Sequence, residues 1–200
     1  MFVGSIKFQR RISPARPSDH ACIIRTYVHN CAMARTKTQS DPDVAAHLLS
    51  ILAEQGEKGL TFGMLSQRCG LAPATLAQRF GSVEGMVRRA VLCEWDRLSL
   101  AVSELEAEAH ISSKGAQALL KNIPLPSPHV LALSLRDTDL RSAAEAWRGQ
   151  VEAALATRRG GGSRGRDAAA MIFAAWQGRC LWDAAGGKGF RLSELLRALP

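Results

Sequence analysis

The sequence lacks the features that mark several classes of protein. No apolar run reaches the roughly 20 residues that a membrane-spanning helix needs, so we expect no membrane span. The five cysteines form no Cys-x-x-Cys pair and are odd in number, which argues against a disulfide framework and favours a reducing compartment. The five histidines are far apart along the chain, so we expect no metal site. No catalytic constellation is recognisable, and we expect neither an enzyme nor a cofactor.

Acidic residues are almost absent from the first forty positions. Residues 1–40 carry seven Lys and Arg side chains against Asp19 alone, so they supply +6 of the formal net charge of +8. Residues 41–92, in contrast, balance five basic against five acidic residues. Because the basic character lies mainly in an N-terminal arm, charge is a weak argument for DNA binding, and the argument has to rest on sequence pattern.

Residues 1–40 also lack any sustained helical or strand period. They contain Pro14 and Pro17, and their one apolar patch, residues 21–24, is too short for the core of a signal peptide. Met33 begins a stretch that looks like a natural start. We therefore predict a disordered basic extension over residues 1–40, with Met33 as a candidate true start.

A helical period begins at Asp43. Apolar side chains recur at three- and four-residue spacing from Val44 to Leu52, which places them on one helix face. Asp41 is the expected N-cap, and Gly56 is expected to end the element. Further helices are expected after the N-cap Thr61 as far as Gly70, and over residues 73–80, 82–105, 112–121, 130–135, 140–156, 167–185 and 192–199, with a glycine-rich loop over 158–165. No stretch alternates with period two, so the expected fold class is all-α.

The segment from Leu60 to Phe80 has the spacing of a helix-turn-helix. A first short helix follows Thr61 and stops at Gly70, and a second short helix starts near Pro73 after a two-residue turn. Such a unit lets the second helix enter a DNA major groove while the first braces it across the backbone. The side chains expected to be buried between the helices are Leu65, Leu71, Leu76 and Phe80.

The outward positions of the second short helix carry side chains that suit DNA. Gln78 can pair bidentately with adenine, Arg79 can pair with guanine, and Thr75 can reach a phosphate or a thymine methyl group. The small Ala74 would allow a close approach. The candidate DNA-binding residues are Thr61, Pro73, Ala74, Thr75, Gln78 and Arg79, together with Arg35 and Lys37 of the basic arm.

This pattern resembles the tetracycline-repressor (TetR) family of transcriptional regulators. Residues 49–56 look like the family's first helix, and residues 81–86 resemble the entry to its long fourth helix. Residues 175–182 are similar to the penultimate helix, which with the last helix usually forms the dimer interface in that family. The resemblance covers about residues 43–200 and is strongest over 43–92.

The resemblance implies a bacterial, cytoplasmic homodimer. Residues 41–92 would form a three-helix helix-turn-helix DNA-binding domain, and residues 93–200 a helical dimerisation and effector-binding domain. Two recognition helices about one DNA turn apart would bind a palindromic operator, from which a small-molecule effector would release the protein. Trp147, Phe173 and Trp176 are candidate ligand-binding residues, although such side chains are more often ordinary core residues. The sequence does not indicate the sign of the ligand's charge.

The chain departs from the family pattern at two positions. The family usually has an aromatic residue where this chain has Ala77, and a lysine near the start of the fourth helix where it has Val83. Both often contact phosphate, so either Arg79 or the arm residues Arg35 and Lys37 would have to compensate. The alternative is a helical interaction protein that kept a TetR-like fold but lost sequence-specific DNA binding.

Overall fold

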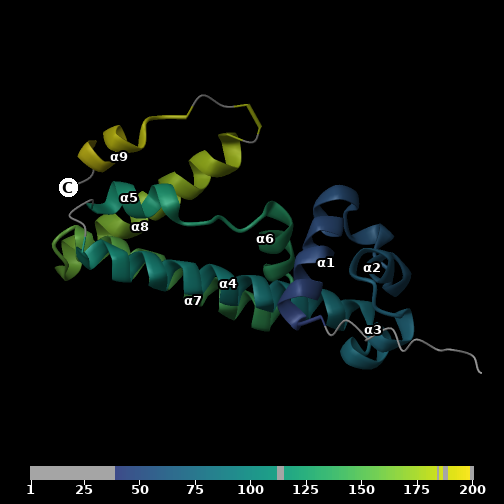
Figure 1. The fold of residues 1–200 in the computed structure, drawn as a ribbon. Coiled ribbons are helices and arrows are strands. Elements are labelled where there is room, and N and C mark those ends of the chain that lie inside the picture. Colours follow the sequence, from purple (N-terminus) through teal and green to yellow (C-terminus); the bar gives the residue numbers. More distant parts are fainter. Residues whose placement is uncertain (1–38, 112–114, 184, 187–188, 199–200) are drawn as a thin grey trace, which may run out of the picture. The chain divides into compact units, whose positions relative to one another are not determined.

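Helices make up the regular structure of the described chain. A computed structural model describes residues 39–111, 115–183, 185–186 and 189–198, and no strand occurs in these ranges, which confirms the all-α class. The predicted disordered extension, with Arg35 and Lys37, lies outside the described residues except for residues 39 and 40. The elements are α1 (Asp41–Gln55), the 3-10 helix η1 (Glu57–Gly59), α2 (Phe62–Cys69), α3 (Pro73–Phe80), α4 (Val83–Ile111), α5 (Gly115–Asn122), α6 (Pro128–Ser134), α7 (Thr138–Arg158), α8 (Gly162–Asp183) and α9 (Leu192–Ala198) (Figure 1).

The start of α1 differs from the sequence prediction by one residue. Ser40, not Asp41, is the N-cap: its side chain accepts a hydrogen bond from the Asp43 backbone N–H at 3.3 Å. The Asp43 carboxylate in turn accepts the Ser40 backbone N–H at 3.1 Å. This reciprocal capping box satisfies two backbone donors at the helix start, which Asp41 as N-cap could not do with the same partner.

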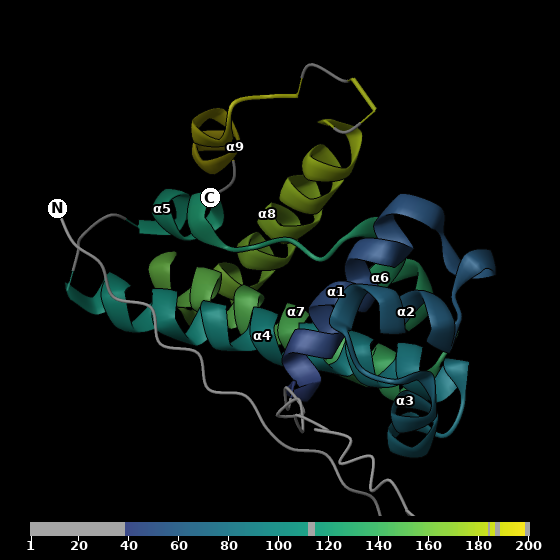
Figure 2. The ribbon, with the colours of Figure 1, turned by 45° about the vertical axis from the view of Figure 1, so that its right-hand side comes forward.

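Two clusters of buried side chains organise the described helices. The first core lies among α1, α2, α3 and the start of α4, and the second lies among α4 to α9 (Figure 2). The first core consists of Val44, Ala45, Leu48, Ile51, Leu52, Leu60, Leu65, Cys69, Leu71, Leu76, Met86 and Ala90. The largest side chains of the second core are Trp95, Trp147, Phe173 and Trp176.

Helix α4 joins the two cores. Its residue Ala90 belongs to the first core and its next residue, Val91, to the second. The helix runs to Ile111, beyond the end expected near Leu105. No helix of the described chain is both long and apolar enough to cross a membrane.

The turn between α7 and α8 corrects the sequence prediction of a loop over residues 158–165. Helix α8 already begins at Gly162, after a turn in which Gly160, Gly161 and Gly162 all have positive φ. Gly165 lies inside α8, where a Cβ would meet the Ala156 carbonyl oxygen at 3.2 Å. Gly160 and Gly161 therefore form a tight turn before α8, and Gly165 permits the close approach of two helices.

Candidate functional site

Helices α2 and α3 are joined by a short turn and pack around the first core. Gly70 ends α2 in the left-handed conformation (φ 74°), and its N–H donates to the Ser66 carbonyl at 2.8 Å. Thr61 caps α2 as predicted, accepting the Met64 N–H at 3.1 Å. The predicted inward residues Leu65, Leu71 and Leu76 are buried, whereas Phe80 is only half-buried. The packing therefore fixes α3 against α2, as the sequence led us to expect.

The outer surface of α3 carries four of the predicted DNA-binding residues without obstruction. Pro73, Ala74, Thr75 and Gln78 are exposed, and Thr61 is exposed at the start of α2. Because Leu76 is the buried anchor of α3, the helix presents this polar surface without disturbing its own packing. The structure thus brings Thr75 and Gln78 onto one accessible helix.

Arg79 forms contacts that the sequence did not predict. Its guanidinium forms an ion pair with the Asp41 carboxylate, donates to the Gln39 carbonyl oxygen at 2.9 Å, and lies 5.4 Å from the centroid of the Phe80 ring. Arg89 contacts the second oxygen of Asp41 at 3.1 Å. Asp41 therefore holds Arg79 against the start of α1, so Arg79 must leave this carboxylate before it can contact a base.

The other cations of residues 41–92 are mostly paired as well. Arg68 is paired with Glu54, and Arg88 with Asp139. The hydrogen bond from Arg68, followed by that from Ser50, lowers the pKa of the Glu54 carboxyl from its ordinary value. Since Arg79 and Arg89 share Asp41, Lys58 is the only cation of residues 41–92 for which no ion pair is found within the described chain. The region offers little unneutralised positive charge.

The two departures from the TetR pattern have packing roles here. Ala77 is half-buried on α3, and Val83 is half-buried at the start of α4, where it packs against the first core. Neither side chain can donate a hydrogen bond to a phosphate. Any phosphate contact must come from other residues.

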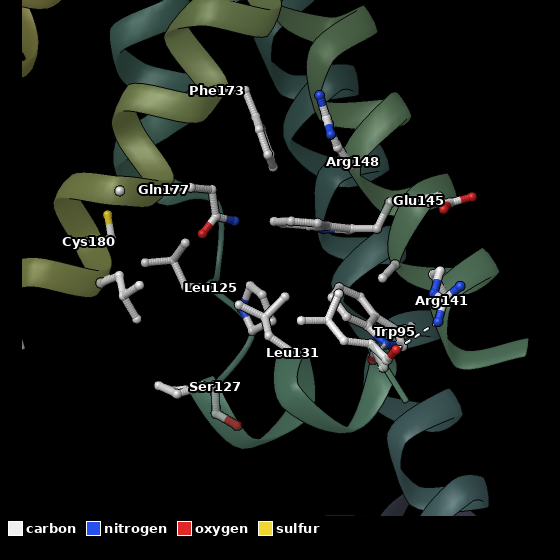
Figure 3. A pocket seen from close by; sticks show the side chains of 18 residues that line it. Trp95, Leu125, Ser127, Leu131, Arg141, Glu145, Arg148, Phe173, Gln177 and Cys180 are labelled. Atoms are coloured by element: carbon white, nitrogen blue, oxygen red, sulfur yellow. Dashed lines mark hydrogen bonds between the residues drawn. The ribbon is translucent and has the colours of Figure 1, made fainter. Parts of the chain in front are cut away.

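A cavity of about 730 Å³ opens beside the second core. This volume falls in the range of small-molecule sites. Trp147 and Phe173, two of the three predicted ligand residues, line it, while Trp176 is buried behind Phe173 and is not part of the wall. The lining residues are Trp95, Leu125, Pro126, Ser127, Pro128, Leu131, Ser134, Leu135, Arg141, Ala144, Glu145, Trp147, Arg148, Phe173, Gln177, Gly178, Cys180 and Leu181 (Figure 3).

Aromatic rings from three helices stand in a row along the wall. The ring centroids of Trp95 and Trp147 are 5.6 Å apart, and those of Trp147 and Phe173 are 5.9 Å apart. The Trp95 indole N–H donates to the buried Ser134 hydroxyl at 2.9 Å, and that hydroxyl donates to the Val130 carbonyl at 2.8 Å. The buried indole N–H of Trp147 has no hydrogen-bond partner among the described residues. This part of the wall is thus apolar, and the Trp147 N–H is a buried donor without a partner in the described chain.

Charged side chains of α7 gather at the mouth of the cavity. Arg141, Glu145 and Arg148 are spaced by four and three residues, which places them on one face of the helix. Arg148 is paired with Glu152 at 2.7 Å. Neither Arg141 nor Glu145 has an ion-pair partner within the described residues, although Arg141 donates to the Leu135 carbonyl oxygen at 2.7 Å. Their helical spacing was legible in the sequence, but the cavity beside them depends on tertiary packing.

The thiols of this region are not poised for chemistry. Burial raises the pKa of Cys93 and of Cys180, which lines the cavity, so both thiols stay protonated near neutral pH. Within the described residues, no group of three His, Cys, Asp or Glu side chains could hold a metal ion.

Helix α8 and the segment after it expose large apolar side chains. Met171, Trp182 and Phe190 have 47%, 68% and 40% of their surface exposed, and the half-buried Gly178 lies between Met171 and Trp182 on α8. Spacings of seven and four residues place Met171, Gly178 and Trp182 on one face of the helix. Gly178 and Trp182 of this stripe fall within the segment 175–182, which the sequence associated with dimerisation.

Contacts also link the cavity-bearing helices to the elements around the first core. Leu133 of α6 packs against both cores, and Arg136, in the turn after α6, forms an ion pair with Glu57 of η1. Arg88 of α4 is paired with Asp139 of α7. The helices that line the cavity therefore also contact the elements around the first core, and α4 takes part in both.

In comparisons with known proteins, no family model, curated protein or solved structure matches this chain.

Proposed function

We propose that this chain is a DNA-binding transcriptional regulator of the tetracycline-repressor type, acting as a homodimer on a palindromic operator. The observation that carries the proposal is the helix α3, anchored by the buried Leu76, which presents Thr75 and Gln78 on its accessible surface. A helix held in this way by a preceding short helix has the geometry of a major-groove reader. Gln78 would contact an adenine edge, and Thr75 a phosphate or a thymine methyl group.

Dimerisation would be provided by the apolar stripe on α8. Met171 and Trp182 are large, exposed and on one face, and a second copy of the chain would cover them. The resemblance of residues 175–182 to the family's penultimate helix supports the same interface. In the cell this regulator would be cytoplasmic and would carry no catalytic activity, and its effector would occupy the cavity lined by Trp147 and Phe173.

The test is a titration of the full-length protein against labelled DNA from upstream of its own gene, with random DNA as competitor, at two salt concentrations. Gln78→Ala should weaken specific binding about tenfold or more, as expected for loss of a bidentate base contact, without changing binding to the random competitor. Gln117→Ala, on the half-buried part of α5, is the matched control and should have no effect. Equal loss in both variants would contradict the assigned role of Gln78.

A second candidate function follows from the charge pairing around α3. Arg68, Arg79 and Arg88 are all engaged by carboxylates, which favours a helical interaction protein without sequence-specific DNA binding. Selection from a random DNA pool separates the two functions: enrichment of a palindromic sequence supports the regulator, and failure to enrich any sequence supports the interaction protein.

A further inference from the structure

We propose that the cavity beside the second core binds an apolar monoanion, an aromatic carboxylate or sulfonate, whose charged group is held by Arg141. This inference names the chemical class of the effector, so its regulatory meaning rests on the proposed function. The binding itself is a property of the free protein and is independent of DNA.

The aromatic rings of the cavity wall indicate which kind of ligand the cavity favours. Trp95, Trp147 and Phe173 supply rings with successive centroids 5.6 Å and 5.9 Å apart and planes inclined at 47° and 67°, and aromatic molecules pack well against the faces and edges of such rings. The cavity volume of about 730 Å³ suits a ligand of several fused or linked rings. Aliphatic side chains, among them Leu125, Leu131 and Leu181, complete the lining, so the cavity favours an apolar ligand with an aromatic body.

The polar groups of the wall select a ligand that accepts hydrogen bonds. The buried Trp147 indole N–H has no acceptor in the described chain, and leaving such a donor unsatisfied is costly. Gln177 extends from α8 into the cavity (Figure 3), and no hydrogen bond of its amide is found within the described residues. A ligand with oxygen acceptors can accept a hydrogen bond from the Gln177 amide, which the protein leaves open.

The charged side chains at the mouth of the cavity determine which sign of ligand charge is favoured. The guanidinium of Arg148 is already neutralised by Glu152 at 2.7 Å, and it lies 5.7 Å from the centroid of Phe173. Arg141 has no carboxylate partner among the described residues and uses one N–H on the Leu135 carbonyl, so further donors remain for a carboxylate or sulfonate. In Figure 3 Arg141 and Glu145 both lie on the side of the cavity opposite Gln177. The lining carries two cations, Arg141 and Arg148, against the single carboxylate of Glu145, which favours an anionic ligand.

The experiment uses two fluorescent probes with the same aromatic body. One is 8-anilinonaphthalene-1-sulfonate, an anion, and the other is N-phenyl-1-naphthylamine, which lacks the sulfonate and is neutral. Both are titrated into the full-length protein without DNA. The anionic probe should saturate at one site per chain. In Arg141→Gln its dissociation constant should rise about tenfold, equivalent to about 1.4 kcal/mol, while that of the neutral probe changes less than about twofold.

Matched variants remove general effects of charge and of folding. Arg166→Gln removes one positive charge from an exposed position of α8 outside the cavity, and it should leave both probes unaffected. Glu145→Gln should leave the affinity for the anionic probe unchanged or slightly higher. Unfolding curves for each variant verify that the fold is retained; Arg141 is exposed, so its substitution should be tolerated.

Several results would overturn the proposal. Equal weakening of both probes in Arg141→Gln would show that the guanidinium does not hold the anionic group. An unchanged affinity for the anionic probe would show the same, and binding without saturation would show that the probe does not occupy a defined cavity. If the probe binds as expected but the protein binds no operator, the ligand site stands and the proposed regulator fails. If operator binding is seen and Arg141→Gln has no effect on the probes, the regulator stands and the ligand class fails.

Discussion

Around the first core the large apolar side chains are enclosed and the four arginines of residues 41–92 are paired with carboxylates, whereas the second core opens into a cavity lined by Arg141 and Glu145, which have no ion-pair partner within the described residues. Leu48, Leu65 and Leu76 are fully buried in the first core, and Asp41 alone engages two arginines. In the second core Trp147 keeps an unsatisfied indole N–H, and Arg141 has no carboxylate partner in the described chain. Closed packing suits a part that presents a fixed surface, and open packing suits a part that takes a ligand.

The largest expected effect tests this difference in packing. Leu76→Ala removes a fully buried side chain from the first core and should lower the free energy of unfolding by about 3 kcal/mol. Leu131→Ala, at the half-buried wall of the cavity, should cost about 1 kcal/mol, because a side chain beside a void has fewer contacts to lose. Urea unfolding at one protein concentration measures both. Equal losses would mean that the two regions are packed alike.

The second largest effect concerns the exposed stripe of α8. Trp182→Glu places a charge where a second copy would bury an aromatic ring, and should weaken dimerisation by roughly thirtyfold, the effect of an interface hot spot of about 2 kcal/mol. Light scattering across a dilution series measures the mass. Leu100→Glu, at an apolar residue 61% exposed on α4, is the control and should remain dimeric. A mass unaffected by Trp182→Glu would remove α8 from the interface.

The paired charges of the first region lead to an expectation for the basic arm. Because most cations near α3 are neutralised, Arg35 and Lys37 should supply phosphate contacts. Their double substitution to alanine should weaken binding to all DNA sequences roughly tenfold and reduce the slope of log affinity against log salt by about 1.8, as for two lost phosphate contacts. Filter binding at four salt concentrations gives the slope. An unchanged slope would place the phosphate contacts elsewhere.

The role of Asp41 can be tested by removing its charge. Asp41→Asn should release Arg79 and strengthen DNA binding about threefold, with a salt slope steeper by about 0.9 because one more cation can meet a phosphate. Glu84→Gln removes an exposed acid from the same region without releasing an arginine, and it measures the general effect of charge. If both variants change the DNA affinity and the salt slope equally in the same binding assay, the release of Arg79 from Asp41 does not contribute to DNA binding.

The smallest effect is the pH dependence of the Glu54–Arg68 pair, which joins α1 to α2 on the surface. The folded-state pKa of Glu54 is lowered from 4.5, so the pair stabilises the protein above about that pH, and this stabilisation is lost as pH falls through the folded pKa. Glu54→Gln should therefore have a slightly lower urea midpoint than the parent protein at pH 7 and the same midpoint in acid. A difference that persists at low pH would point to packing rather than charge.

The sequence predicted the first region in detail because its signals are local. Thr61, Gly70 and Pro73 each act within a few residues, as a cap, a stop and a helix start, and all three have those roles in the structure. The predicted N-cap of α1 was wrong by one residue because Ser40 and Asp41 both have side chains that can cap a helix. The hydrogen bond from the Ser40 backbone N–H to the Asp43 carboxylate favours Ser40.

Features that depend on tertiary contacts were less accessible from the sequence. The glycines near residue 162 indicated a loop, but Gly165 is needed for the close approach of α8 to the end of α7. The sequence predicted an outward-facing Arg79, but not its ion pair, because Asp41 lies far from it in the sequence, at the start of α1. Trp147 and Phe173 were candidate ligand residues, yet the cavity that joins them to Arg141 forms only when α4, α6, α7 and α8 pack together.

The passage of α4 through both cores has a consequence for how the protein unfolds and evolves. Ala90 and Val91 are consecutive residues with one in each core, so no cut in this helix separates two self-sufficient pieces. The cores should melt in a single cooperative transition, and a fragment ending near residue 92 would leave Met86 and Ala90 on a frayed helix end. An exchange of helices α1–α3 between proteins would therefore also require the exchange of α4, the helix that both cores share.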